Sequence, residues 1–182
     1  MTFDKVIEDG RLWAVRYESE DLNELERVFT QWNDTGWLLQ FFSDNFEDLV
    51  SYFKVTKLDE AVYDTMEDSD ALECLIMDIS PEANLDELFR PLENGRSTEM
   101  LLGKEKARLR NRPRHASWLR IYAIKLNPGI YVITGGAIKL TRTMQEREHT
   151  LKELEKLEKV RQYLVACGVV DDDSFIDLIM ED

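Results

Sequence analysis

Six basic residues stand at alternate positions between residues 104 and 114. Only one carboxylate, Glu105, lies among them. In an extended strand, side chains two residues apart point to the same side. The spacing therefore predicts a strip of like charge, which is tolerable only where something anionic lies against it. The strip consists of Lys104, Lys106, Arg108, Arg110, Arg112 and Arg114.

More candidate residues follow the strip. Arg120 and Tyr122 share one face of the strand expected at 118–126, and Lys139 and Arg142 follow the next apolar run. Arginine binds phosphate through paired hydrogen bonds, and the flat faces of arginine and tyrosine stack on unpaired bases. This combination of residue types is typical of RNA binding.

The same residues would also suit cleavage of RNA without a metal ion. In that reaction the 2′-hydroxyl attacks the adjacent phosphorus, and arginines such as Arg120 can stabilise the charge that develops there. Histidine ordinarily changes its charge near neutral pH, so His115 is a candidate for proton transfer. The alternatives are a loop position without a role for His115, and a structural salt bridge to the acidic N-terminal half for Arg120.

Charge is segregated along the 182-residue chain, whose formal net charge is −14. Residues 1–94 hold 7 basic and 24 acidic residues, residues 95–142 hold 11 and 2, and residues 143–182 hold 5 and 11. The middle block is thus a basic segment in an acidic protein. It either faces a polyanion such as RNA or docks on the acidic helices of the same chain.

Other classes of function have little support in the sequence. The chain has two histidines and no Cys or His spacing typical of metal ligands, so no metal site is expected. It also has no glycine-rich phosphate-binding loop, so no nucleotide cofactor is expected. Cys74 and Cys167 are expected to be buried free thiols of a reducing compartment. No apolar run approaches the length of a membrane span, so we expect a cytoplasmic protein without a membrane partner.

The apolar pattern predicts an α+β fold in a single domain of residues 1–182. Residues 1–94 form its acidic, mostly helical part, residues 95–142 its basic sheet core, and residues 143–182 a C-terminal helical extension. A β-hairpin at 118–134, with a type II turn at Asn127-Pro128-Gly129, is apolar on both faces. We therefore expect it at the centre of a sheet covered by helices, with a bulge or bend at Gly135-Gly136. A further strand is expected at 11–17, and helices at 22–32, 37–42, 46–53, 57–66, 69–79, 150–167 and 174–180.

This order of elements resembles that of the RelE/HigB/ParE superfamily of prokaryotic toxins. The resemblance covers residues 11–17 and 85–143. It is carried by LFRPL, the basic strip, SWLRIYAI, a turn and YVITGGAIKLT. It implies a sheet of mostly antiparallel strands covered by N-terminal helices. For the HigB-like branches it also implies ribosome-dependent mRNA cleavage without a metal ion.

The resemblance implies roles for particular residues. Arg120 matches the strand arginine that contacts the scissile phosphate, and Lys139 and Arg142 match the basic residues after the last central strand. His115 stands in the loop before the strand as a candidate acid or base. Lys104, Lys106 and Arg108 stand where the family places basic residues for the RNA backbone. The implied partners are the ribosome with its mRNA and a neutralising antitoxin that carries a helix-turn-helix.

A second class of function remains open at this point. The same fold could serve as a non-catalytic interaction module, of mobile-element origin, whose basic groove receives an acidic segment of a partner. In a variation, the acidic tail 171–182 of this chain covers the strip itself.

Overall fold

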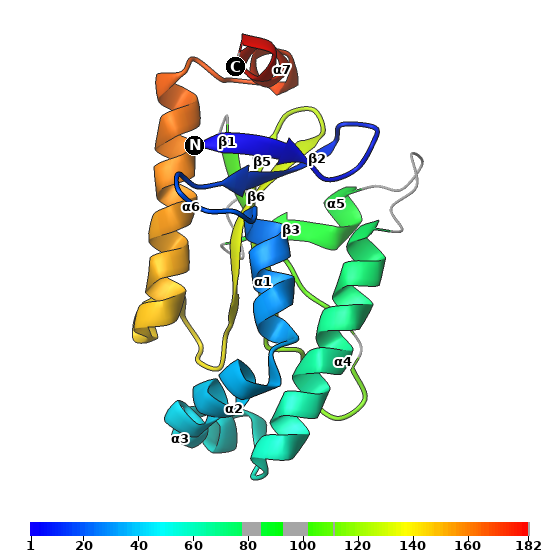
Figure 1. The fold of residues 1–182 in the computed structure, drawn as a ribbon, viewed down its shortest axis with the longest axis vertical. Coiled ribbons are helices and arrows are strands. Elements are labelled where there is room, and N and C mark those ends of the chain that lie inside the picture. The colour runs from blue at the N-terminus through cyan, green and yellow to red at the C-terminus, as the bar shows by residue number, and fades with distance from the viewer. Residues whose placement is uncertain (78–84, 93–101, 111, 182) are drawn as a thin grey trace.

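A computed structural model describes residues 1–77, 85–92, 102–110 and 112–181 (Figure 1). The strands of this part of the chain form one sheet with the order β1-β2-β6-β5-β4-β3. Its strands are β1 (Thr2–Lys5), β2 (Leu12–Arg16), β3 (Phe89–Pro91), β4 (Leu102–Ala107), β5 (Leu119–Leu126) and β6 (Ile130–Ile138).

The strand pairing confirms the α+β class and makes the sheet mixed. β2 runs parallel to β6, and the other pairs of neighbouring strands are antiparallel. This parallel pair places the N-terminal strand β2 directly beside β6 of the central hairpin. The edge strand β1 was not predicted, because its four residues have no apolar run and are stabilised by pairing with β2.

The central hairpin is present as predicted, and β5 and β6 are buried on both faces. The pairing shifts by one residue between Tyr122 and Ala123, opposite Thr134 and Gly135, which is the expected bulge. The turn prediction was wrong in its type. Gly129 does not have the positive φ that a type II turn requires, and the Asn127–Pro128 peptide bond is cis.

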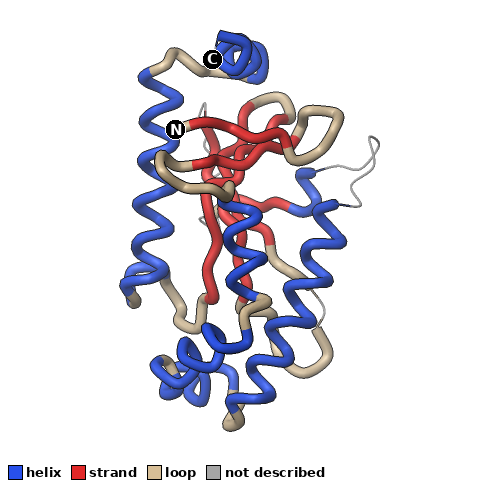
Figure 2. The backbone as a smooth tube through the Cα atoms, viewed as in Figure 1, coloured by secondary structure: helices blue, strands red, loops and turns tan. Residues whose placement is uncertain are grey.

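One face of the sheet is covered by N-terminal helices, as Figure 2 shows. Two neighbouring helices predicted at 57–66 and 69–79 form instead a single helix, α4. Ser69 does not begin a helix; it is buried and accepts a hydrogen bond from Asn33 at 3.2 Å. The buried positions of α4 continue at helical spacing past this serine. The helices on this side are α1 (Glu24–Trp32), α2 (Thr35–Asp44), α3 (Phe46–Asp48), a π-helical turn (Leu49–Phe53), α4 (Leu58–Met77) and α5 (Leu85–Leu88).

The opposite face is covered by the C-terminal helices α6 (Glu148–Ala166) and α7 (Asp172–Glu181), which follow a 3-10 turn (Met144–Glu146). The apolar stripe of α6 packs on the sheet through Leu157, Val160 and Leu164. The helix ends at Ala166, and the expected glycine, Gly168, follows its cap with a φ of +81°. Val169 then donates its N–H to Leu164 and Gly168 donates to Val165, which satisfies carbonyls that the helix end leaves open. The sheet thus has two cores, one on each face.

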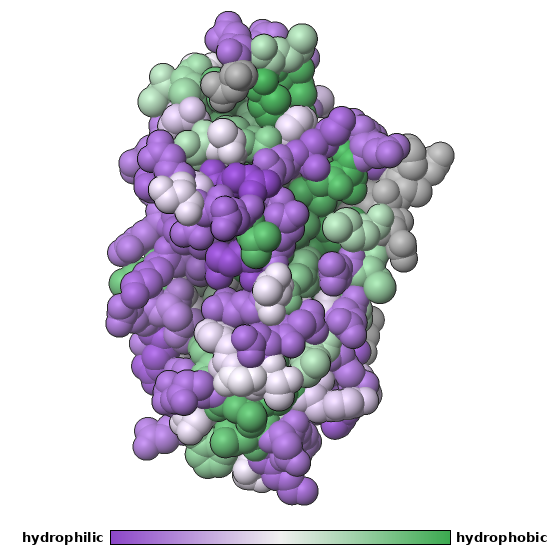
Figure 3. Space-filling view, in the orientation of Figure 1, coloured by the Kyte–Doolittle hydropathy of each residue, from purple (hydrophilic) through white to green (hydrophobic). Residues whose placement is uncertain are grey.

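The surface is mostly hydrophilic in the view of Figure 3. Hydrophobic side chains gather at the end formed by α2 and α3, where Leu39 and Phe46 are exposed. The two cysteines are free, but both are exposed, so their expected burial was wrong. Cys74 lies on an exposed position of α4 and Cys167 directly follows the last residue of α6, whereas their apolar neighbours in the sequence suggested burial. In the part of the chain that the structure describes, no helix is long and apolar enough to cross a membrane.

Candidate functional site

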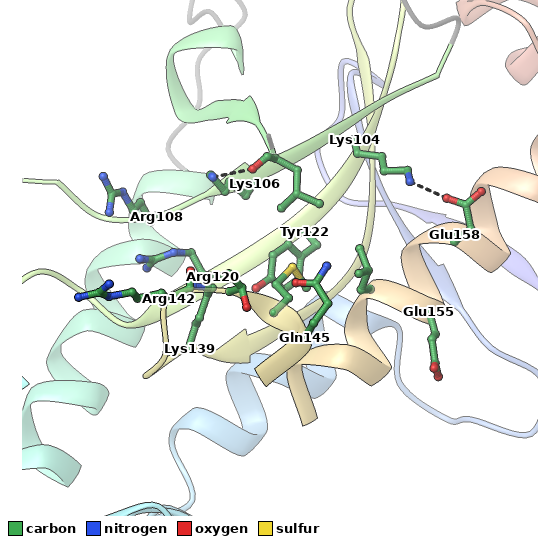
Figure 4. Close-up of a pocket in the computed structure, with 14 residues that line it drawn as sticks. Lys104, Lys106, Arg108, Arg120, Tyr122, Lys139, Arg142, Gln145, Glu155 and Glu158 are labelled. Atoms are coloured by element: carbon green, nitrogen blue, oxygen red, sulfur yellow. Dashed lines mark hydrogen bonds and ion pairs between the residues drawn. The ribbon is translucent and has the colours of Figure 1, made fainter. Parts of the chain in front are cut away.

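A groove of about 720 Å³ lies between the sheet and the N-terminal half of α6 (Figure 4). Three sets of side chains build it. Alternate residues of β4 and β5 face it, the segment that follows β6 forms one wall, and α6 forms the other. The lining residues are Leu92, Lys104, Lys106, Arg108, Arg120, Tyr122, Lys139, Arg142, Thr143, Met144, Gln145, Leu154, Glu155 and Glu158.

Strand geometry explains why the basic side chains meet here. Lys106 is paired with Tyr122 in the β4–β5 register, so the two strands present both residues on the face that α6 covers. Arg120 precedes Tyr122 by two residues and shares that face. Lys139 and Arg142 arrive from the end of β6, which lies beside β5. Residues far apart in the sequence are thereby brought to one groove.

Arg120 is the most buried cation of the groove. Its Nη1 donates to the carbonyl oxygens of Ser117 at 2.6 Å and Leu119 at 2.7 Å. Burial, with a smaller contribution from the like charge of Arg108, lowers the pKa of Arg120 to about 10. The backbone therefore holds the guanidinium in one orientation, and its Nε and Nη2 make no hydrogen bond to any described residue.

Two lysines of the groove are fixed in the same way. Lys106 Nζ donates to the carbonyl of Leu92 at 2.8 Å, and Lys139 Nζ donates to the carbonyls of Thr141 at 2.6 Å and Arg142 at 2.5 Å. Burial lowers the pKa of both amines, and the positive charge of Arg120 lowers each further. The groove thus holds several positive charges that repel one another.

These cations have few carboxylates near them. Lys104 pairs with Glu158 at 2.6 Å, at the end of the groove that α6 borders (Figure 4). Within the described residues, the other five cations of the groove form no ion pair, although the chain has fourteen more acidic than basic residues. They are Lys106, Arg108, Arg120, Lys139 and Arg142. An anion bound in the groove would relieve their repulsion.

The second half of the basic strip has a different environment. Arg112 Nε lies 2.6 Å from Asp68 Oδ1, and Arg114 Nη2 lies 2.9 Å from Asp64 Oδ1 on α4. His115 Nε2 lies 3.0 Å from the other oxygen of Asp64. We call residues 112–115 with these two aspartates the α4 latch. Here the alternative of internal charge matching describes the contacts, because the acidic helix neutralises the strip.

The structure therefore divides the predicted site residues. Arg120, Lys139 and Arg142 converge with Lys104, Lys106, Arg108 and Tyr122 in the groove. His115, expected beside them, is absent from the lining and stacks on Trp118 with a ring-centroid distance of 4.2 Å. Arg110, Arg112 and Arg114 also lie outside it, since the chain leaves the β4 strand after Ala107 and no longer alternates toward α6.

Sequence reasoning missed the wall of the groove that belongs to α6. From the sequence, Leu154, Glu155 and Glu158 are distinguished only as part of the helix expected at 150–167. Their position two turns along α6, opposite β4, depends on tertiary packing. The 3-10 turn that contributes Met144 and Gln145 gave no chemical signal either.

The described part of the acidic tail, residues 171–181, does not line the groove. Asp172, at the start of α7, accepts hydrogen bonds from the backbone N–H groups of Gly129 at 2.9 Å and Ile130 at 3.1 Å. Phe175 of α7 is buried against Phe3 and Trp13. The described part of the tail thus packs beside the hairpin turn, which contradicts the variation in which residues 171–182 lie over the basic strip.

The fold and groove define an α+β protein with an open cationic site. Comparison with family models, with curated proteins and with solved structures finds no match for this chain. Its function is therefore argued from the groove.

Proposed function

We propose that the groove binds the sugar–phosphate backbone of single-stranded RNA, as expected of a toxin-like RNA-binding protein. The observation that carries the proposal is a set of five groove cations that form no ion pair within the described residues of an acidic protein. Three of them, Lys106, Arg120 and Lys139, are partly buried. The protein has carboxylates in excess, yet no described carboxylate forms an ion pair with any of these cations. Phosphate groups of an RNA would fill that position, and arginine would bind them through paired N–H donors.

The arrangement of elements also supports a toxin-like assignment. The groove arginine Arg120 stands on a central strand, after the basic residues of β4 and before the basic residues that follow β6. This is the order that the resemblance to the RelE/HigB/ParE superfamily implies. The proposal includes the partners of that family: mRNA on the ribosome, and an antitoxin that neutralises the protein.

The proposal extends to metal-independent cleavage of the bound RNA. The 2′-oxygen would form a bond to the adjacent phosphorus while the bond from phosphorus to the 5′-oxygen breaks. Arg120, oriented by two carbonyls, would stabilise the charge on the phosphorane. One proton must leave the 2′-hydroxyl and one must reach the 5′-oxygen. Lys106 and Lys139 are the groups for these transfers, because their lowered pKa values make neutral amines more accessible.

Binding is tested by fluorescence anisotropy of a labelled RNA of about 12 nucleotides. For single-stranded nucleic acid, the logarithm of the binding constant falls by about 0.7 per phosphate neutralised for each tenfold rise in salt. Five contacts therefore give a slope of about −3.5 above 0.1 M salt. Arg142→Ala is expected to reduce this slope by about 0.7. The matched control is Lys57→Ala, which removes an exposed charge on the N-terminal side of α4, away from the groove.

Two results would contradict RNA binding. One is equal effects of Arg142→Ala and Lys57→Ala on the salt slope. The other is tighter binding of an acidic peptide such as labelled polyglutamate than of RNA, which would favour the non-catalytic interaction module.

Cleavage is tested by expressing the chain alone in bacteria and mapping mRNA 5′ ends. New 5′ ends and arrested growth are expected for the wild type and not for Arg120→Met. If wild-type expression leaves both growth and 5′ ends unchanged while RNA binding holds, the protein binds RNA without cleaving it.

A further inference from the structure

The hydroxyl of Tyr122 is buried in the groove without a hydrogen-bond partner. The side chain is 1% exposed, and no donor or acceptor among the described residues reaches its oxygen. An unpaired buried hydroxyl ordinarily costs folding free energy, and most buried tyrosines find a partner. A protein that retains such a group at the floor of a groove has a polar atom available for a ligand.

The surroundings of Tyr122 show what kind of ligand group would meet it. Met144 belongs to the same buried apolar cluster as Tyr122, Leu154 packs against that cluster, and both line the groove. The cation paired with Tyr122 across the strands is Lys106, whose amine donates instead to the carbonyl of Leu92. Tyr122 follows Arg120 by two residues on β5, about 7 Å along the strand. A group that reaches the hydroxyl is therefore neutral and polar, and it adjoins a phosphate held by Arg120.

In RNA the ribose 2′-hydroxyl has these properties. It lies beside a backbone phosphate, carries no charge, and both donates and accepts hydrogen bonds. A phenol likewise donates and accepts. Resting on the proposed RNA binding, the geometry points to Tyr122 as the residue that hydrogen-bonds the 2′-hydroxyl of the nucleotide whose phosphate lies at Arg120, which makes the groove selective for RNA over DNA.

The protonation state of Tyr122 agrees with this role. Burial raises the pKa of the phenol well above its ordinary range, although the positive charge of Arg120 acts in the opposite direction. The hydroxyl therefore keeps its proton at neutral pH and remains a donor. Met144 is a flexible side chain that can adapt to a ligand entering the same space.

The test compares the wild type with Tyr122→Phe on two oligonucleotides of identical base order. One is RNA and the other has 2′-deoxyribose throughout, with uracil retained in both. One neutral hydrogen bond corresponds to about a three- to tenfold change in affinity. Tyr122→Phe is expected to weaken RNA binding by that factor and to leave DNA binding unchanged. Tyr52→Phe, at an exposed tyrosine outside the groove, is the matched control and should change neither.

Thermal unfolding separates this contact from a structural role. Because the hydroxyl of Tyr122 has no hydrogen-bond partner among the described residues, Tyr122→Phe should melt at the same temperature as the wild type or higher. Equal losses on RNA and DNA, or no loss on either, would overturn the ribose contact while leaving RNA binding intact. If the wild type binds neither oligonucleotide, the proposed function fails, and the inference fails with it.

Discussion

Replacing Arg120 by methionine is expected to stabilise the protein while weakening RNA binding. Burial and the like charge of Arg108 lower the pKa of Arg120 from 12.5 to about 10, which corresponds to a cost of about 3 kcal/mol for keeping the charge in the folded protein. Because the pKa is lower in the folded state, this cost is present in full at every pH below about 10. Methionine has a similar length and no charge. It gives up two hydrogen bonds to carbonyls, at about 1 kcal/mol each.

The expected net gain of Arg120→Met is therefore about 1 kcal/mol in the free energy of unfolding, or about 2–4 °C in melting temperature for a protein of this size. Urea unfolding at pH 7, without ligand, measures it. Arg142→Met is the control, because that side chain is exposed and should change stability by less than about 0.5 kcal/mol. The reasoning is refuted if Arg120→Met lowers the free energy of unfolding by 1 kcal/mol or more, since Arg120 would then be a structural residue.

Burial raises the pKa of Glu105 to about 7. The folded protein therefore binds an extra proton, and its stability falls as the pH rises from about 4.5 to 7. Glu105→Gln should flatten this pH dependence, and its free energy of unfolding in urea should exceed that of the wild type by about 1–3 kcal/mol at pH 8. Parallel pH profiles of the two proteins would contradict this. A Cβ on Gly135 would lie 1.9 Å from Glu153 Oε2, so Gly135→Ala should lower stability by about 1–3 kcal/mol. Gly129→Ala, with open space around its Cβ, is the calorimetric control, and equal melting temperatures would contradict the clash. Asp64→Ala should cost about 1–3 kcal/mol and speed tryptic cleavage in the α4 latch, with RNA affinity within twofold of the wild type; a large loss of affinity would show that the latch belongs to the site.

The elements with strong local signals were predictable from the sequence. The hairpin follows from two apolar runs of β-branched residues, and the end of α6 follows from Gly168 after an amphipathic stripe. Where tertiary contacts decide, the sequence was insufficient. α4 continues through Ser69 because that side chain is buried against Asn33, and β1 forms because β2 offers it an edge.

The candidate site shows the same division. Alternation along β4 and β5 correctly placed Lys104, Lys106 and Arg120 on one face. It could not say that the alternation stops after Ala107, or that α4 presents Asp64 to the following loop. The charge of a segment is visible in its sequence, whereas the charges that face it are set by the fold. The second half of the strip thus meets the acidic helix α4, whereas the first half lines the groove.

The charge on the rest of the molecule should also shape RNA binding. With a net charge of −14, the protein as a whole repels RNA, whereas the groove attracts it at short range. The Debye length is about 30 Å at 0.01 M salt and about 10 Å at 0.1 M. At low salt, acidic residues far from the groove therefore also repel the RNA. Adding salt up to about 0.1 M screens this repulsion first. RNA affinity is therefore expected to rise or stay level up to about 0.1 M and to fall above it. Anisotropy titrations from 0.01 to 0.3 M salt measure this. A linear fall over the entire range would mean that the groove cations act on the RNA without interference from the acidic surface.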